Sequence, residues 1–558
     1  MTSELLRHAT EWAEHDPDPK TAAEIAALVG QSDEAALAER FTGPLAFGTA
    51  GLRGEIGAGE TRMNLAVVTR ATAGLVAYLK ETVGERPRVV VGCDARHGSA
   101  EFQRAVCEVV AAAGGEAIQL EPQRPTPVTA FAVKHLQADA GVMVTASHNP
   151  PRDNGYKVYL GGRAATGPGE GEGVQIVPPA DAQIAEAIAA APFADEVPRD
   201  AEGVQQANVD EAYLARLAEH TERLRPTNPG AVKLTLTPMH GVGGETARKG
   251  LTKAGFTDLA VVDEQWNPDP DFPTVNFPNP EEPGALDLAM ATAERNGSDL
   301  IIALDPDADR CALAIPAPGT EKGWRQLTGD ETGALLSEFL ASKGATGAFA
   351  SSIVSGRLIA KIAKAHGLDH QFTLTGFKWI ARTPKLSFGY EEAIGYCCDP
   401  TAVRDKDGIS AAVTAASLAA ELKAQGKSFE DALDDLARHH GLHATAPLTF
   451  RVADTQLITD AMARLRANPP EELAGAEVTE FADLADGYLG LPPTEGVLMR
   501  TEADDRVVCR PSGTEPKLKC YLEVVLDVDT QQPVPRADAA ARLDALRRDV
   551  AAATGMQQ

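Results

Sequence analysis

The segment RPRVVVGCDARHGSAEFQRAVCEVVAAAGGEAIQL, residues 86–120, carries the amino-acid pattern of a complete β-α-β unit. A β-branched apolar run, Val89–Val91, favours a buried strand. After a polar turn, apolar residues recur every three or four positions from Ser99 onward, which is typical of a helix packed on a sheet. The pair Gly114-Gly115 ends that helix, and a second apolar run follows. We therefore predict two parallel strands joined by a helix.

The same pattern recurs from Ala231 (AVKLTLTPMHGVGGETARKGLTKAGFTDLAVV) and from Gly347 (GAFASSIVSGRLIAKIAKAHGLDHQFTL). The last part of the chain, with APLTFRVAD and RVVCRPSGTEPKLKCYLEVVLDVD, lacks the repeat and predicts a mixed sheet with helices. A chain of 558 residues exceeds the size at which one core stops growing. We expect three similar α/β domains and a C-terminal α+β domain, with boundaries near Asn208, Gly323 and His443, giving domains 1–207, 208–322, 323–442 and 443–558.

The net charge, the cysteine pattern and the apolar runs of the sequence limit the partners and the cellular location that we expect. The net charge of −28 repels polyanions, so nucleic acid is not an expected partner. The seven cysteines are scattered without a C-x-x-C pair, which is typical of reduced thiols in a cytoplasm. No apolar run reaches membrane-spanning length, and the N-terminus lacks the pattern of a signal peptide. We expect a cytoplasmic protein with no membrane partner; the sequence leaves its oligomeric state open.

The segment VMVTASHNPPRDNGYKVYLGG, residues 142–162, places polar chemistry between two apolar strands. We predict that SHNPPRD is an exposed loop held by its two prolines, with Ser147 at its start. A plain turn explains a lone S-H-N-P in most proteins. The alternative is a nucleophile or phosphoryl carrier at Ser147, with His148 and Lys157 near enough to orient it or move its proton.

A second group of polar residues follows the apolar strand Ile301–Leu304. Asp305, Asp307 and Asp309 alternate with a proline and an alanine, so three carboxylates share one tight loop. Like charges at such spacing favour a divalent cation between them. An EF-hand is excluded because its sixth position, here Arg310, requires Gly and its twelfth, here Pro316, requires Glu. A solvated acidic turn remains the competing interpretation.

Two further motifs carry weaker signals. In CRPSGTEPKLKCYLEV, the fork of Arg510, the hydroxyls of Ser512 and Thr514, and the turn at Gly513 together make a candidate anion site. In LSFGYEEAIGY, Glu391 and Glu392 lie on a Gly-bounded loop after a strand. Paired acids of this kind usually face solvent, but in a cleft they are natural acceptors for sugar hydroxyls.

Taken in order, TASHNP, DPDADR, GYEEAIGY and RPSGTEP resemble the motifs of the α-D-phosphohexomutase family. The resemblance runs from FGTAGLRG at Phe47 to about Tyr521. The segments TGFKWI, EEAIGY and DKDG are most similar to the subgroup that contains the second type of phosphoglucomutase and the phosphopentomutases. The family implies four domains around a central cleft, three with a shared α/β core. It also implies an isomerase that transfers a phosphoryl group through a phosphoserine enzyme and a sugar bisphosphate, which acts as intermediate and activator.

The resemblance also implies roles for individual residues. Ser147 is the phosphorylated residue and, with Asp305, Asp307 and Asp309, binds Mg2+. His148 and Lys157 match positions implicated in proton transfer. Positive residues beside the transferred phosphate are Arg53 and Arg310. Residues that bind the substrate are Glu391, Lys378, Lys406 and the loop for the phosphate that is not reacting, Arg510, Ser512, Gly513 and Thr514.

The identity of the sugar is left open by one departure from the family. Many hexose-specific members have EES or EMS where this chain has EEA, so Ala393 lacks a hydroxyl that would contact the sugar. A hexose mutase acting between C1 and C6 of glucose or mannose phosphate is expected, with a phosphopentomutase or a sugar-bisphosphate synthase as alternatives. A metal-dependent phosphatase would share these residues, and a non-catalytic sensor would be expected to lack Ser147 or an aspartate.

Overall fold

A computed structural model describes residues 2–49, 51–165, 171–512, 516–529 and 531–556. The contacts within the chain divide it into two compact units. The first contains residues 1–327, 381–389 and 393–424, and the second contains residues 328–380, 390–392 and 425–558. None of the helices in the described part of the chain combines the length and apolar character needed to cross a membrane.

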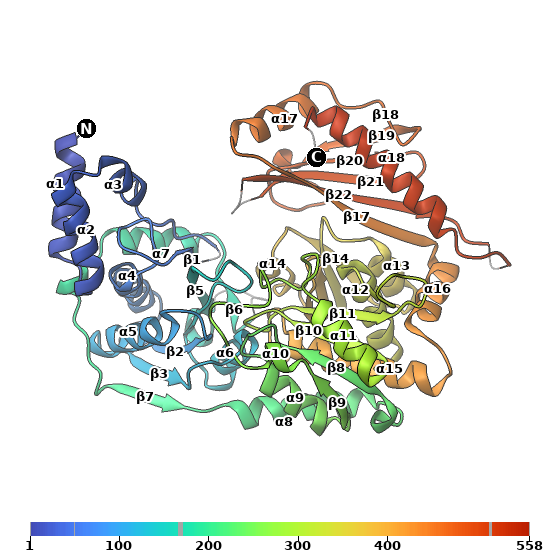
Figure 1. Ribbon diagram of the computed structural model, residues 1–558, viewed down its shortest axis with the longest axis horizontal. Coiled ribbons are helices and arrows are strands. Elements are labelled where there is room, and N and C mark those ends of the chain that lie inside the picture. Colours follow the sequence, from blue (N-terminus) through green and yellow to red (C-terminus); the bar gives the residue numbers. More distant parts are fainter. Residues whose placement is uncertain (1, 50, 166–170, 513–515, 530, 557–558) are drawn as a thin grey trace. The chain divides into compact units, whose positions relative to one another are not determined.

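The first unit begins with three helices, α1 (Thr2–Glu14), α2 (Pro19–Gln31) and α3 (Glu34–Arg40), which pack around Ile25, Leu37 and Phe41. The first sheet follows, in the order β1-β5-β4-β2-β3-β7, with β6 beside β5. Its strands are β1 (Leu52–Glu55), β2 (Arg88–Cys93), β3 (Glu116–Leu120), β4 (Ala140–Val144), β5 (Asp153–Leu160), β6 (Val174–Gln175) and β7 (Val204–Ala207). The helices of this part are α4 (Leu65–Val83), α5 (Ser99–Ala112), α6 (Thr126–His135) and α7 (Ala180–Ala189) (Figure 1).

The predicted β-α-β unit of residues 86–120 is confirmed as β2-α5-β3, with β2 and β3 parallel. Strand β2 is buried along nearly its whole length, as expected for a central parallel strand covered on both faces. Strands β4 and β5 pair in antiparallel fashion, so the segment between them turns back sharply at the end of the sheet. That turn carries Ser147.

The second sheet, in the order β12-β11-β10-β8-β9, also belongs to the first unit. Its strands are β8 (Lys233–Thr237), β9 (Asp258–Val261), β10 (Leu300–Leu304), β11 (Cys311–Pro316) and β12 (Trp324–Gln326). Its helices are α8 (Asp210–Leu224), α9 (Gly244–Lys253), α10 (Asp263–Trp266) and α11 (Asp287–Asn296). The repeat predicted from Ala231 is confirmed as β8-α9-β9 with parallel strands. Helix α15 (Gly408–Ala424) is buried on nearly every face, and it packs against α8, α9 and β10.

A third sheet, in the order β14-β13-β15-β16, contains the third repeat as the parallel pair β13 (Ala348–Ser352) and β14 (Asp369–Thr373) joined by α13 (Leu358–Ala365). Its other strands are β15 (Leu386–Glu391) and β16 (Gly395–Cys397), and nearby in sequence are α12 (Gly329–Ser342), α14 (Phe377–Ile380) and α16 (Phe429–His440). The division between the two units passes through β15.

The C-terminal part of the second unit is an antiparallel sheet in the order β17-β22-β21-β20-β19-β18, with two helices (Figure 1). Its strands are β17 (Leu442–Arg451), β18 (Glu472–Leu473), β19 (Ala476–Asp483), β20 (Val497–Thr501), β21 (Arg506–Pro511) and β22 (Lys517–Leu526). The helices are α17 (Gln456–Ala467) and α18 (Arg536–Thr554), whose apolar residues share one core with the sheet. The predicted fold class, three related α/β parts and a different C-terminal α+β part, is confirmed.

Candidate active site

Ser147 lies at the start of the turn between β4 and β5. Its φ of 51° is in the left-handed region, which a serine adopts only where its surroundings hold it there. Its backbone N–H donates to Thr145 Oγ1 at 2.9 Å. The prediction of an exposed loop is wrong: Ser147 is 3% exposed and the turn from His148 to Asp153 is half-buried apart from Arg152.

The buried Arg96 explains why most of this turn is half-buried rather than exposed. Its guanidinium donates to the carbonyl oxygens of Ser147 (2.7 Å), Asn149 (2.6 Å), Pro150 (2.7 Å) and Asp153 (3.1 Å). The planar fork of arginine suits such a set of acceptors, which no other side chain could satisfy. Arg96 follows β2, far from the turn in sequence, and is not among the predicted site residues. The polar turn GCDARHGS, which contains Arg96, is the feature of the sequence that could have indicated this role.

We expect Arg96→Lys to lower kcat/KM by about 10- to 100-fold, because an ammonium group cannot reach four carbonyl oxygens at once. It should also lower the melting temperature, since hydrogen bonds from a charged donor contribute about 1.5–3 kcal/mol each. The matched control is Arg152→Lys, which changes an 85% exposed arginine on the same turn and should leave both quantities unchanged. Equal behaviour of the two variants would contradict the role of Arg96.

The hydroxyl of Ser147 contacts a carboxylic acid side chain and an imidazole. It donates to Asp305 Oδ2 at 2.8 Å and lies 3.3 Å from His148 Nδ1. Burial lowers the pKa of His148 well below its usual value, and the charges of Arg310 and Arg53 add to this effect. A neutral imidazole beside the hydroxyl can accept its proton.

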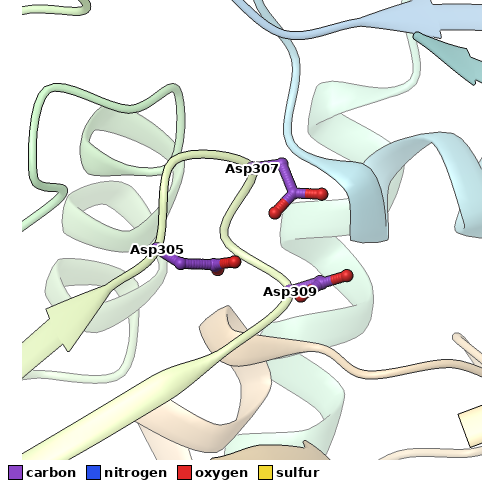
Figure 2. Close-up of side chains that lie close together, drawn as sticks. All are labelled: Asp305, Asp307 and Asp309. Carbon is purple, nitrogen blue, oxygen red and sulfur yellow. The ribbon is translucent and has the colours of Figure 1, made fainter. Parts of the chain in front are cut away.

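Asp305, Asp307 and Asp309 lie on the loop between β10 and β11, as predicted (Figure 2). One oxygen of each carboxylate lies within 4.8 Å of those of the other two, and all three side chains are buried. Burial raises the pKa of Asp305 well above its usual value, and the charges of Asp307 and Asp309 raise it further. Within the described part of the chain, the Oδ1 atoms of Asp307 and Asp309 are buried and have no hydrogen-bond partner. These oxygen donors fit a hard divalent cation.

Two lysines and a threonine surround the same carboxylates. Lys157 Nζ lies 2.8 Å from Asp307 Oδ2 and 2.9 Å from Asp309 Oδ2. Burial alone would lower the pKa of Lys157, but the two carboxylates outweigh it and the pKa is raised. Thr126 Oγ1, which we did not select from the sequence, donates to Asp307 Oδ2 at 2.6 Å. Lys406 Nζ lies 3.3 Å from Asp309 Oδ2, so this predicted substrate-binding residue lies at the acidic loop.

The acidic loop is held by backbone contacts with segments distant in sequence. Gly408 N donates to Ala308 O at 3.1 Å, and Val242 N donates to Pro306 O at 2.8 Å. A Cβ at Gly408 would lie 2.4 Å from Arg310 O, and one at Gly241 would lie 2.3 Å from Pro306 Cα. Neither position can carry a side chain without moving the loop, because both neighbours are backbone atoms.

Each of the two predicted arginines contacts a residue of this centre. Arg53, in β1, donates from Nη1 to Asn149 Oδ1 at 3.1 Å, on the Ser147 turn. Arg310 donates its backbone N–H to Asp305 Oδ1 at 2.9 Å, and its side chain lies 3.8 Å from Glu281. The first unit thus brings together Arg53, Ser147, His148, Lys157, the three aspartates, Arg310 and Lys406.

The other predicted residues belong to the second unit. Glu391 is the last residue of β15 and is 9% exposed, so the prediction that it lies on a loop is corrected by one position. Lys378 lies on α14. Arg510 lies in β21 and forms a hydrogen bond with Tyr521. Burial raises the pKa of Tyr521, and the charges of Glu392 and Glu391 also raise it, whereas Arg510 lowers it. Ser512 N donates to Lys517 O at 2.9 Å, and Gly513 and Thr514 lie outside the described residues.

Four family models match the chain in order. They are described as phosphoglucomutase/phosphomannomutase alpha/beta/alpha domain I (residues 44–194), domain II (211–319) and domain III (328–440), and the C-terminal domain (450–535). Together they span most of the sequence.

Comparisons of this chain with single proteins agree with the four family models. The chain is 44% identical over 467 residues to a probable phosphomannomutase of Haemophilus influenzae, covering 83% of this chain and 93% of that protein. It is 35% identical over 590 residues to the phosphoribomutase of Saccharomyces cerevisiae, covering 94% and 93%. Its fold is similar to the crystal structure of a putative phosphomannomutase from Thermus thermophilus, with a TM-score of 0.70 at 24% identity, covering 91% and 99% of the two chains.

Proposed function

Because this chain belongs to the phosphoglucomutase/phosphomannomutase family, we propose that it transfers a phosphoryl group between C1 and C6 of a hexose phosphate. The proposed route runs through a phosphoserine at Ser147 and a sugar bisphosphate intermediate. The observation that supports this proposal is the 2.8 Å contact between Ser147 Oγ and Asp305, beside two further buried carboxylates whose Oδ1 atoms have no hydrogen-bond partner among the described residues. A hydroxyl in this position becomes a phosphate ester beside a cation site.

The transfer step needs charge neutralisation more than a strong base. A sugar hydroxyl oxygen forms a bond to phosphorus, the bond from phosphorus to Ser147 Oγ breaks, and the hydroxyl proton ends on the serine oxygen. His148 is the neighbour placed to relay this proton, and Arg53 and Arg310 are assigned to the transferred phosphate. Asp305, Asp307 and Asp309 would hold Mg2+, which supplies positive charge to the phosphoryl oxygens.

The remaining residues are assigned to the substrate. Glu391 accepts hydrogen bonds from the sugar hydroxyls, and Lys378 and Lys406 provide positive charge. The distal phosphate is held by Arg510 together with Ser512, Gly513 and Thr514. When the bisphosphate reverses its orientation, this phosphate becomes the one returned to Ser147.

A pentose phosphate is the second candidate substrate, and one residue favours it. Ala393 lacks the hydroxyl that many hexose-specific members place after the paired acids. The relatives include one named for a hexose, phosphomannomutase, and one named for a pentose, phosphoribomutase. The other residues assigned above would serve either sugar.

The test compares glucose 1-phosphate, mannose 1-phosphate and ribose 1-phosphate as substrates for wild type and Arg510→Ala. We expect Arg510→Ala to raise KM by about 10- to 100-fold on the preferred sugar, because a charge-assisted contact is lost, and to leave Ser147 phosphorylation intact. The control is Arg547→Ala, which removes an arginine on α18. A preference for ribose 1-phosphate would select the pentose. Release of inorganic phosphate in place of an isomer would identify a hydrolase and overturn the proposal.

A further inference from the structure

Glu392, which follows Glu391 in the chain, belongs to a closed ring of three side-chain oxygens in the second unit. Ser352 Oγ lies 2.8 Å from Ser355 Oγ, and Glu392 Oε2 lies 3.1 Å from the first and 2.9 Å from the second. Both serines are fully buried and Glu392 is half-buried. The mutase roles proposed above use none of these three residues.

The ring contains more contacts than its hydroxyl groups can supply with protons. Three oxygen–oxygen contacts need three protons, and two serines provide two. Each serine oxygen also accepts one backbone N–H, from Ser355 to Ser352 at 3.2 Å and from Glu392 to Ser355 at 3.1 Å. Both hydroxyls lie so as to donate to Glu392 Oε2, which leaves no proton for the contact between the two serines. A proton on the carboxyl group would donate to one serine and free the hydroxyl of that serine to donate to the other.

We propose that Glu392 is a positioning residue that holds a proton in this ring and thereby fixes the sugar-contacting Glu391 next to it. The inference rests on the proposed function, because it takes Glu391 as a sugar ligand. Deprotonation of Glu392 would leave one contact of the ring without a proton and would place a charge beside Glu391. Sugar affinity should therefore fall when the ring ionises.

The groups that face Glu392 favour its neutral form. Burial, together with the charges of Glu391 and Asp330, raises its pKa to about 7, although the hydrogen bond from Ser355 opposes the rise. Two phenols, Tyr390 and Tyr521, also interact with it. Tyr390 donates to Asp330 Oδ1 at 2.9 Å. The pKa is raised, so the ring is intact below about pH 7 and is lost as the pH rises through that value.

The loop that carries Ser355 is also held by Arg506, which limits its movement when the ring ionises. Arg506 donates to Ile353 O at 3.0 Å and to Ser355 O at 2.6 Å. Arg506 also lies 3.1 Å from Glu523, whose second oxygen accepts Arg357 N at 2.8 Å. We therefore expect ionisation of the ring to displace Glu392 and, with it, the adjacent Glu391.

The experiment measures KM and kcat between about pH 6 and pH 8.5 for the full-length enzyme and its variants on the preferred sugar 1-phosphate. In Glu392→Gln, the amide N–H2 replaces the titrating proton, so KM should not show the additional rise. In wild type, KM should rise by about five- to tenfold more than in Glu392→Gln over this range, with little change in kcat. Ser355→Ala should raise KM at every pH. Glu472→Gln, at an exposed edge strand, is the control for loss of one carboxylate and should follow wild type.

Parallel KM profiles for wild type and Glu392→Gln would overturn the inference. Infrared difference spectra provide a measurement that does not need activity. Wild type should lose one protonated-carboxyl band between about pH 6 and pH 8 that Glu392→Gln lacks, and identical spectra would also overturn the inference. Absence of mutase turnover and of phosphoserine in wild type would instead count against the proposed function alone.

Discussion

Ser147→Ala is expected to abolish mutase turnover, with a loss of roughly four to six orders of magnitude, and to remove covalent phosphate from the protein. The hydroxyls of Thr145 and Thr126 have other partners: Thr145 Oγ1 accepts the Ser147 N–H at 2.9 Å, and Thr126 Oγ1 donates to Asp307 Oδ2 at 2.6 Å. Turnover of the preferred sugar phosphate and intact-protein mass spectrometry after incubation with the sugar bisphosphate measure the two effects.

The control for this substitution is Ser342→Ala, which removes a hydroxyl bonded to Phe339 O within α12. It should keep full activity and one phosphate per chain. A Ser147→Ala protein that still carries phosphate and turns over normally would show that the carrier lies elsewhere.

Removal of the divalent cation is expected to stop turnover, and added Mg2+ should restore it. Asp307→Asn should lower kcat by about 10²- to 10³-fold at a fixed Mg2+ concentration and raise the concentration needed for half-maximal activity. The reason is local: Asp307 Oδ2 is occupied by Lys157 and Thr126, which leaves the buried Oδ1 as the donor for a cation. Titration of activity with Mg2+ after treatment with chelator gives both quantities.

Asp271→Asn is the matched control, since this carboxylate is 74% exposed and pairs with His97. Its Mg2+ titration should coincide with that of wild type. Melting temperatures of both variants separate a loss of cation binding from a loss of folding. Full activity of wild type in excess chelator would rule out a role for the metal.

The fold was predictable where local pattern and burial agree. The β-branched run at Val89, the helical spacing after Ser99 and the Gly pair at Gly114 each favour one structure, and the same unit appears three times. The acidic loop was predictable because three aspartates alternate directly after an apolar run that favours a buried strand. The ordered motifs then identified the family, which the four family models confirm.

Features that depend on distant residues were not predictable. The Ser147 turn looked exposed because its polar composition is typical of a surface loop, whereas Arg96 binds its carbonyl oxygens. Likewise, Lys157 was selected without its partners Asp307 and Asp309, which lie 150 and 152 residues further along the chain. The amino-acid pattern carries no information on such pairings until the chain is folded.

The contact of Gly408 with the acidic loop has a consequence for recombining this protein with its relatives. The models for domains II and III meet between residues 319 and 328, which looks like a natural crossover point. Yet residues 393–424 belong to the same compact unit as residues 1–327, and Gly408 and Lys406 contact Ala308 and Asp309 directly. A chimera joined at that crossover would take the acidic loop from one parent and its supporting helix from the other. Inheritance of residues 393–424 from the parent that supplies residues 1–327 keeps this pairing intact, so the exchangeable block of the gene is discontinuous.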